Sequence, residues 1–330
     1  MFEDNSPDGT HNKIRYTEQT GKFGAQFEIG FSEQGVEVTV NKLISRSRHV
    51  LYVNLVEPLL RFIFVSKGFV LLHSACISDD TGNNGLLFSA PPDTGKTTTV
   101  LKCLKDGYSF LADDMTILKM PNEALCFPKP MTISAHTFKT ATTVSNGHDG
   151  FSKGGLKLRS IIHSRTGRQF MRKLGTKNVP IFTINTIGQS IVKPPKFRVE
   201  DLFQHVRLRE KTSIVEMLFL EKGGEQVEEI DKDNALRRSI ENSDDAFIFP
   251  PYKQILQYLR INNKSANDLL VLERSMIDKF LSNIGGCRVI KSDTRGWFQR
   301  VVELWPNIVA TSKYTAGFII LYILAVFPRL

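Results

Sequence analysis

Cysteine is scarce in this sequence, and its scarcity argues against two kinds of protein. The four cysteines among 330 residues lie far apart and form no CxxC pair: Cys76, Cys103, Cys126 and Cys287. Their spacing predicts reduced thiols and not a disulfide-stapled domain or a zinc site. The first nineteen residues are polar and do not predict a secretory signal. We therefore expect a cytoplasmic protein.

Low-complexity tracts, internal repeats and a membrane-spanning apolar run are also missing. One uncharged stretch covers residues 314–327, and its 14 residues would form a helix of about 21 Å. This length falls short of the roughly 30 Å hydrocarbon core of a bilayer. We expect a buried or interface helix there. A membrane-associated tail, with Trp305 and Tyr314 at the membrane surface, is the alternative.

Acidic residues are almost absent from one window, which carries the whole excess of positive charge. The chain has 43 Lys and Arg against 34 Asp and Glu, and residues 129–177 contain ten basic residues and one acid, Asp149. Such a window is typical of an anion-binding segment or of a solvated loop, and both interpretations stay open. Arg165, Arg168 and Arg172 are its candidates for gripping a substrate. Aromatic residues are sparse there and no nucleic-acid motif occurs, so nucleic acid is not an expected partner.

Hydrophobic periodicity predicts an α/β protein. Residues 26–31 and 36–40 alternate around a turn and predict a β-hairpin, after a polar tail over residues 1–20. Apolar residues at helical spacing predict a helix over 55–67 that ends at Gly68. Beyond the central unit we expect long loops with short strands over residues 120–177. The remaining expected elements are strands over 69–73, 214–220 and 287–290, and helices over 234–241, 266–283 and 295–304.

A strand–loop–helix–strand unit follows in the middle of the chain. We expect strands over residues 85–89 and 108–112 and a helix over 96–104 that ends at Gly107, which is a βαβ pattern. The predicted organisation is a small β-rich region over residues 1–54, a main domain over 55–305 and a hydrophobic tail over 306–330.

The loop between this strand and helix fits the spacing of a phosphate-binding P-loop, with alanine in place of the first glycine. Backbone N–H groups and a helix N-terminus would surround the phosphates, Lys96 would bridge phosphate oxygens, and the Thr97 hydroxyl would bind Mg²⁺. The loop therefore predicts ATP and Mg²⁺ as ligands. The expected nucleotide-binding residues are Ala90, Pro91, Pro92, Asp93, Thr94, Gly95, Lys96, Thr97 and Thr98.

Two adjacent carboxylates, Asp113 and Asp114, follow the returning strand. A helix of about 15 Å and a strand of about 16 Å bring the chain back to the edge of the sheet where the loop lies. One carboxylate could then hold Mg²⁺ and the other could take a proton from an acceptor hydroxyl. A helix N-cap or a turn is the structural alternative. His73, taken alone, predicts a buried polar group more than a catalyst.

These segments together resemble the HPr kinase/phosphorylase family and its related P-loop kinases. The similarity covers the run Leu72-His73-Ser74-Ala75, the P-loop, Leu111-Ala112-Asp113-Asp114, Phe127-Pro128-Lys129-Pro130 and residues 217–238. The resemblance implies a fold shared with phosphoenolpyruvate carboxykinase, with a mixed central sheet. It also implies that Asp113 is the acid/base, that Asp114 binds the metal with Thr97, and that His73 lies near the γ-phosphate; the reverse division between the two aspartates stays open.

The expected function is ATP- and Mg²⁺-dependent transfer of the γ-phosphate to a hydroxyl, with serine as the first candidate, of a protein, peptide or small molecule. The family signature LE-x-RG-x-G has no clear match here, so HPr itself is not the expected acceptor. The alternative is a nucleotide-binding switch or ATPase without an acceptor, tethered to a membrane through residues 314–327. Homo-oligomer formation is left open.

Overall fold

The computed structural model describes residues 2–4, 13–20, 23–32, 35–92, 94–133, 137, 180–191, 196–203, 205–247, 252–294, 296–306 and 308–309. The chain divides into two compact units, each built from three segments. The first unit contains Met1–Leu71, Pro130–Arg198 and Ile240–Ile277, and the second contains Leu72–Lys129, Val199–Ser239 and Asp278–Leu330. The predicted tail over residues 314–327 and the arginines at 165, 168 and 172 lie outside the described residues.

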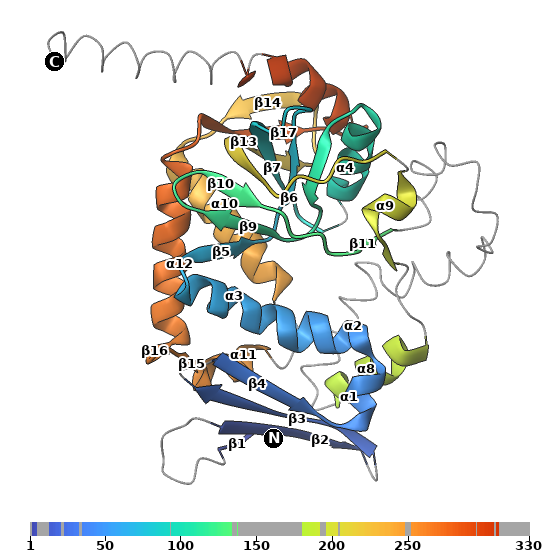
Figure 1. Cartoon of the computed structure of the whole chain (residues 1–330), viewed down its shortest axis with the longest axis vertical. Helices are drawn as coiled ribbons and strands as arrows, with labels where there is room; N and C mark the ends of the chain where they lie inside the picture. Colours follow the sequence, from blue (N-terminus) through green and yellow to red (C-terminus); the bar gives the residue numbers. More distant parts are fainter. Residues whose placement is uncertain are drawn as a thin grey trace, which may run out of the picture. The chain divides into compact units, whose positions relative to one another are not determined.

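The first unit contains a four-stranded antiparallel sheet in the order β1-β2-β3-β4 (Figure 1). Its strands are β1 (Phe2–Asp4), β2 (Lys13–Thr20), β3 (Phe23–Ser32) and β4 (Gly35–Val40). The predicted hairpin is confirmed as β3 and β4. The predicted polar tail is wrong, because residues 13–20 form a strand whose alternate side chains Ile14 and Tyr16 are buried.

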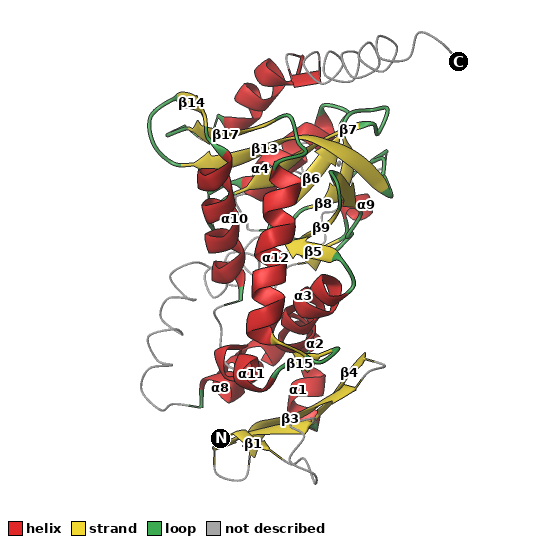
Figure 2. Ribbon diagram, turned by 90° about the vertical axis from the view of Figure 1, so that its left-hand side faces the viewer, coloured by secondary structure: helices red, strands yellow, loops and turns green. Residues whose placement is uncertain are grey.

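Helices α1 (Lys42–Arg46) and α8 (Ile181–Ile191) cover one face of this sheet, as Figures 1 and 2 show. Phe182 of α8 packs edge-on against the rings of Tyr16 and Phe27. The Glu18 carboxylate accepts hydrogen bonds from the first backbone N–H groups of α8. The sheet and the helices therefore share one small hydrophobic core.

The rest of the first unit is mainly helical. The helix predicted over residues 55–67 is confirmed: α3 (Glu57–Ser66) ends two residues before Gly68, whose φ is +84°. The continuous helical stretch Arg48–Ser66 is long and apolar enough to cross a membrane, and half of its most apolar window is buried inside the protein. The other elements among the described residues are α2 (Arg48–Leu51), the π-helical η1 (Tyr52–Val56), β5 (Phe69–Leu72), β11 (Met131–Thr132), β12 (Lys196–Phe197), the last part of α10 (Lys232–Ala246), α11 (Tyr252–Tyr258), β15 (Arg260–Ile261), β16 (Lys264–Ser265) and most of α12 (Ala266–Leu281).

The second unit is built on a mixed sheet whose strands follow the order β9-β10-β13-β7-β6-β8. The long strand β13 (Lys211–Glu221) pairs with β7 along one side and with β10 and then β17 along the other. The chain is thus an α/β protein with a mixed central sheet and a small antiparallel N-terminal segment, as predicted. The other strands are β6 (Ala75–Ser78), β7 (Asn84–Ser89), β8 (Ser109–Ala112), β9 (Thr116–Lys119), β10 (Glu123–Leu125), β14 (Gln226–Glu229) and β17 (Gly286–Lys291).

Strands β6 and β8, the last two in this order, are buried on both faces, because every side chain along them is inaccessible. Both β7 and β8 run antiparallel to β6, which lies between them, so β7 and β8 are parallel to each other and end at the same edge. Helix α4 (Lys96–Lys105) connects them and packs against β6. Among the described residues, the helices of this unit are α4, α9 (Val199–Leu202), the first part of α10, the end of α12 and residues 297–306.

Candidate functional site

The loop that joins β7 to α4 brings the first predicted site residues to the sheet edge. Ala90 and Thr94 are buried at 3% and 4% exposure, whereas Pro91 is exposed and Pro92 is half-buried. Gly95 has a φ of +136°, which side chains rarely adopt, so glycine is required where the loop enters the helix. The first turn of α4 contains no acidic residue, and its first backbone N–H groups have no acceptor within the helix, which favours anions. Asp93 lies outside the described residues.

The start of α4 meets the end of β8 through one hydrogen bond. The Thr97 Oγ1 hydroxyl donates to Asp113 Oδ2 over 3.0 Å. Asp113 is 5% exposed, and its other oxygen, Oδ1, is buried. Lys96 Nζ is buried as well, and within the described part of the chain neither atom has a hydrogen-bond partner. A buried polar atom without a hydrogen-bond partner destabilises the fold. A ligand bound at this place would provide the partners that Lys96 Nζ and Asp113 Oδ1 lack.

The Asp114 carboxylate lies against a lysine and a histidine side chain. Lys129 Nζ lies 2.6 Å from Asp114 Oδ2, and His73 Nε2 lies 3.4 Å from Asp114 Oδ1. The side chain of Asp114 is 45% exposed, whereas those of Lys129 and His73 are 8% and 10% exposed. The carboxylate therefore opens to solvent on one side and rests on two enclosed partners on the other.

The segment that carries Lys129 is bound to the strand that carries the aspartates. The backbone N–H of Phe127 donates to Leu111 O over 3.1 Å, and Cys126 Sγ donates to the same carbonyl. Leu111 lies in β8, two residues before Asp113. This anchoring explains how Lys129 reaches Asp114 across 15 positions of sequence. This contact was not predicted from the sequence, in which Lys129 is one of the ten basic residues of the window over 129–177.

The electrostatics of the two aspartates differ. Burial raises the pKa of Asp113 to about 6, although Lys96 opposes the shift. Desolvation of Asp114 by the surrounding protein would by itself raise its pKa. Lys129 and His73 more than offset this effect and hold the pKa well below its usual range. Burial also lowers the pKa of Lys96, against the attraction of both aspartates. Asp114 thus stays ionised, while Asp113 can exchange a proton near neutral pH.

Trp297 packs against the loop and is hydrogen-bonded to the ends of β13 and β17. A Cβ added at Gly95 would lie 2.6 Å from Cζ3 of Trp297, so the indole ring rests directly on this glycine. The indole Nε1 donates to Glu221 O over 3.1 Å and to Ile290 O over 3.2 Å. Because these carbonyls lie near the carboxyl ends of β13 and β17, Trp297 connects both strand ends to the loop.

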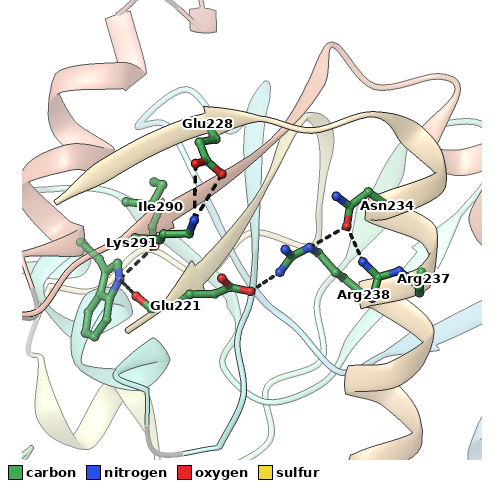
Figure 3. A network of polar contacts seen from close by, with 8 residues as sticks. Glu221, Glu228, Asn234, Arg237, Arg238, Ile290 and Lys291 are labelled. Carbon is green, nitrogen blue, oxygen red and sulfur yellow. Dashed lines mark hydrogen bonds and ion pairs between the residues drawn. The ribbon is translucent and has the colours of Figure 1, made fainter. Parts of the chain in front are cut away.

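Polar contacts brace the same strand ends. Figure 3 shows the Glu221 carboxylate directed at Arg238 of α10, and Arg238 in turn donates to Asn234. Lys291 lies 3.4 Å from the Glu228 carboxylate of β14. These contacts fix the carbonyls on which Trp297 depends.

The site fits an anion and a divalent cation that bind together. Lys96 Nζ and the start of α4 suit phosphate oxygens, and the hydroxyl and carboxylates of Thr97, Asp113 and Asp114 suit Mg²⁺. Among the described residues no group of three or more His, Cys, Asp or Glu is placed to hold a metal unaided. Mg²⁺ needs no such cage, because it is commonly held by one or two protein oxygens together with phosphates and water.

Of the predicted site residues, the structure brings together His73, Lys96, Thr97, Asp113 and Asp114. Thr98 follows them on α4 and is half-buried. Lys129 and Trp297 are the additions that only the structure reveals. No model of a known protein family matches the chain, and no curated protein matches it.

Proposed function

We propose that the chain is an ATP- and Mg²⁺-dependent phosphotransferase of the HPr-kinase-like P-loop type. It would transfer the γ-phosphate of ATP to a hydroxyl, with serine as the leading acceptor. The observation that carries the proposal is the meeting of Lys96, Thr97 and Asp113: a hydroxyl bonded to a carboxylate beside two buried polar atoms that lack partners. A purely structural carboxylate pair would not leave a buried ammonium unpartnered at the same place.

Nucleotide binding falls to the loop and the start of α4. The backbone N–H groups at the helix start would bind phosphate oxygens, and Lys96 Nζ would supply a buried positive charge. Gly95 allows the backbone to approach the phosphates closely, and Trp297 holds it in that conformation. Lys96 would thus gain the partner that it lacks.

The metal would be held by the Thr97 hydroxyl and the Asp114 carboxylate. When bound, Mg²⁺ would neutralise charge on the transferred phosphate. Asp114 suits this role because it is ionised at neutral pH and half open to solvent. His73 and Lys129 hold the orientation of this carboxylate.

Asp113 would take the proton of the acceptor hydroxyl. Its pKa of about 6 is close to the pH at which it would work, and Oδ1 is available to accept a proton while Oδ2 is bonded to Thr97. The Thr97–Asp113 hydrogen bond supports the alternative assignment, in which Asp113 binds the metal beside Thr97 and Asp114 takes the proton. The two divisions differ in what each mutation should do to the Mg²⁺ requirement.

Phosphoryl transfer from ATP labelled at the γ-phosphate tests the function. Free serine and serine-containing peptides would be offered with Mg²⁺, and both the labelled acceptor and the released phosphate would be measured. Asp113→Asn should lower transfer at saturating Mg²⁺ by about 100-fold or more, since general acid–base catalysis contributes about 10²–10⁴. Asp106→Asn, an exposed aspartate at the end of α4, is the matched control.

Asp114→Asn should instead raise the Mg²⁺ concentration needed for half-maximal transfer. If Asp113→Asn has that effect and Asp114→Asn lowers the rate at saturating Mg²⁺, the roles are reversed. Transfer that survives Asp113→Asn unchanged would sink the assignment of this residue. Release of phosphate without any labelled acceptor would favour the ATPase or switch function.

A further inference from the structure

We propose that Lys129 is a second phosphate-binding cation, which contacts the terminal phosphate of the bound nucleotide. This inference rests on the proposed function and extends the site beyond the loop and its acidic pair. It differs from the simpler idea that Lys129 only neutralises Asp114. The two ideas make different predictions for nucleotide affinity.

The placement of Lys129 is specific. Its side chain is 8% exposed, and its ammonium group lies 2.6 Å from Asp114 Oδ2. Its backbone N–H donates to Phe127 O over 2.7 Å, and Phe127 is bound to Leu111 in β8. A long, flexible lysine is rarely enclosed in this way on a surface loop. The chain therefore delivers this ammonium group to the edge where the loop and the aspartates meet.

A second cation would offset the repulsion between the two carboxylates of the site and a bound triphosphate. Asp113 and Asp114 bring two carboxylates to the place where a triphosphate would bind, and like charges this close in partly buried surroundings repel strongly. Lys96 and Lys129 act on both aspartates and also on each other. Two enclosed ammonium groups that repel each other gain most from an anion that both can contact.

A lysine ammonium group can bind a carboxylate and a phosphate oxygen at the same time. Its compact ammonium group sits on a flexible stem and has three donors, so it can keep Asp114 as one acceptor and take a phosphate oxygen as another. The aspartates lie where the acceptor hydroxyl would meet the transferred phosphate. Lys129, held on Asp114, would thus face the terminal phosphate and not the inner ones.

The test compares ATP with ADP. Binding of each nucleotide would be measured by isothermal titration calorimetry in Mg²⁺ for the wild-type chain, for Lys129→Met, for Asp114→Asn and for the double variant that carries both substitutions. Lys129→Met should weaken ATP binding by about tenfold or more, as expected for a lost charge-assisted hydrogen bond, and should change ADP binding by less than about threefold. Lys105→Met, an exposed lysine at the end of α4, is the matched control.

The double variant separates the two ideas. If Lys129 contacts phosphate, removing it should weaken ATP binding in the Asp114→Asn background too. An effect that disappears in that background, or that is equal for ATP and ADP, overturns the proposal. Should Lys129→Met fail to fold, Lys129→Gln keeps a donor for Asp114, removes the charge and makes the same comparison. Wild-type chain that binds no nucleotide would contradict the proposed function itself, whereas wild-type affinity in both Lys129 variants contradicts this inference alone.

Discussion

Replacing Gly95 by alanine should destabilise the chain even when no nucleotide is present. Two physical costs meet at this position. The backbone φ of +136° lies where L-residues are strained, and the new Cβ would come within 2.6 Å of Cζ3 and 3.2 Å of Cε3 of Trp297. The indole ring cannot easily retreat, because Trp297 is 1% exposed and its Nε1 is bonded to two carbonyls.

The size of the effect follows from these two costs. The strained backbone conformation should cost about 1–2 kcal/mol, and forcing extra atoms into a packed core should cost about 1–3 kcal/mol more. Gly95→Ala should therefore lower the free energy of unfolding by roughly 2–5 kcal/mol. Gly107→Ala provides the control, since Gly107 has a φ of +97° and nothing lies within 4 Å of its added Cβ. This control should show the backbone cost alone.

Urea unfolding followed by circular dichroism would measure both variants, and a double-mutant cycle would isolate the packing cost. In a Trp297→Leu background, Gly95→Ala should lose only about 1–2 kcal/mol, because the clashing ring atoms are gone. An equal cost of Gly95→Ala in both backgrounds would refute the contact between the loop and Trp297. Equal costs of Gly95→Ala and Gly107→Ala in the wild-type background would refute it as well.

Two further predictions concern buried charges away from the site. Burial raises the pKa of Glu216 to about 7, although Arg288 opposes the shift, so the charged carboxylate destabilises the fold progressively as the pH rises from its ordinary value of 4.5 through 7. The free energy of unfolding of Glu216→Gln minus that of wild type should thus increase by up to about 3 kcal/mol from pH 5 to pH 8. The same difference at both pH values would contradict this prediction. Arg61→Met should cost about 3–5 kcal/mol in urea unfolding, because it leaves Glu273, 5% exposed, without its cation. Asp244→Asn, which removes a partner of Arg61 that is 58% exposed, should cost less than about 1 kcal/mol; similar losses in the two variants would argue against the buried pair.

The features of the site that could be predicted from the sequence are those formed by residues close together along the chain. The loop, Lys96 and Thr97 are contiguous, and the lengths of the following helix and strand were enough to predict that Asp113 returns to the same edge. The predicted strand–helix–strand order is found, although β6 lies between the two parallel strands. That insertion depends on strand pairing over distance, which periodicity does not reveal.

The missed features depend on contacts between distant segments. Lys129 reaches Asp114 because hydrogen bonds from Phe127 and Cys126 tie its segment to β8. Trp297 lies on Gly95 although most of the second unit separates them in sequence. Strand β2 was not predicted because most of its residues are polar and its alternation of buried side chains, Ile14 and Tyr16, is short.

The most direct test of the account is the binding of ATP with Mg²⁺ to the unmodified chain and to Lys96→Met, measured by isothermal titration calorimetry. Removing the buried ammonium group should weaken binding by about tenfold or more, while Lys105→Met should bind like wild type. The wild-type chain should bind ATP saturably and only in the presence of Mg²⁺. No binding by the wild type, or equal binding by Lys96→Met, would contradict it.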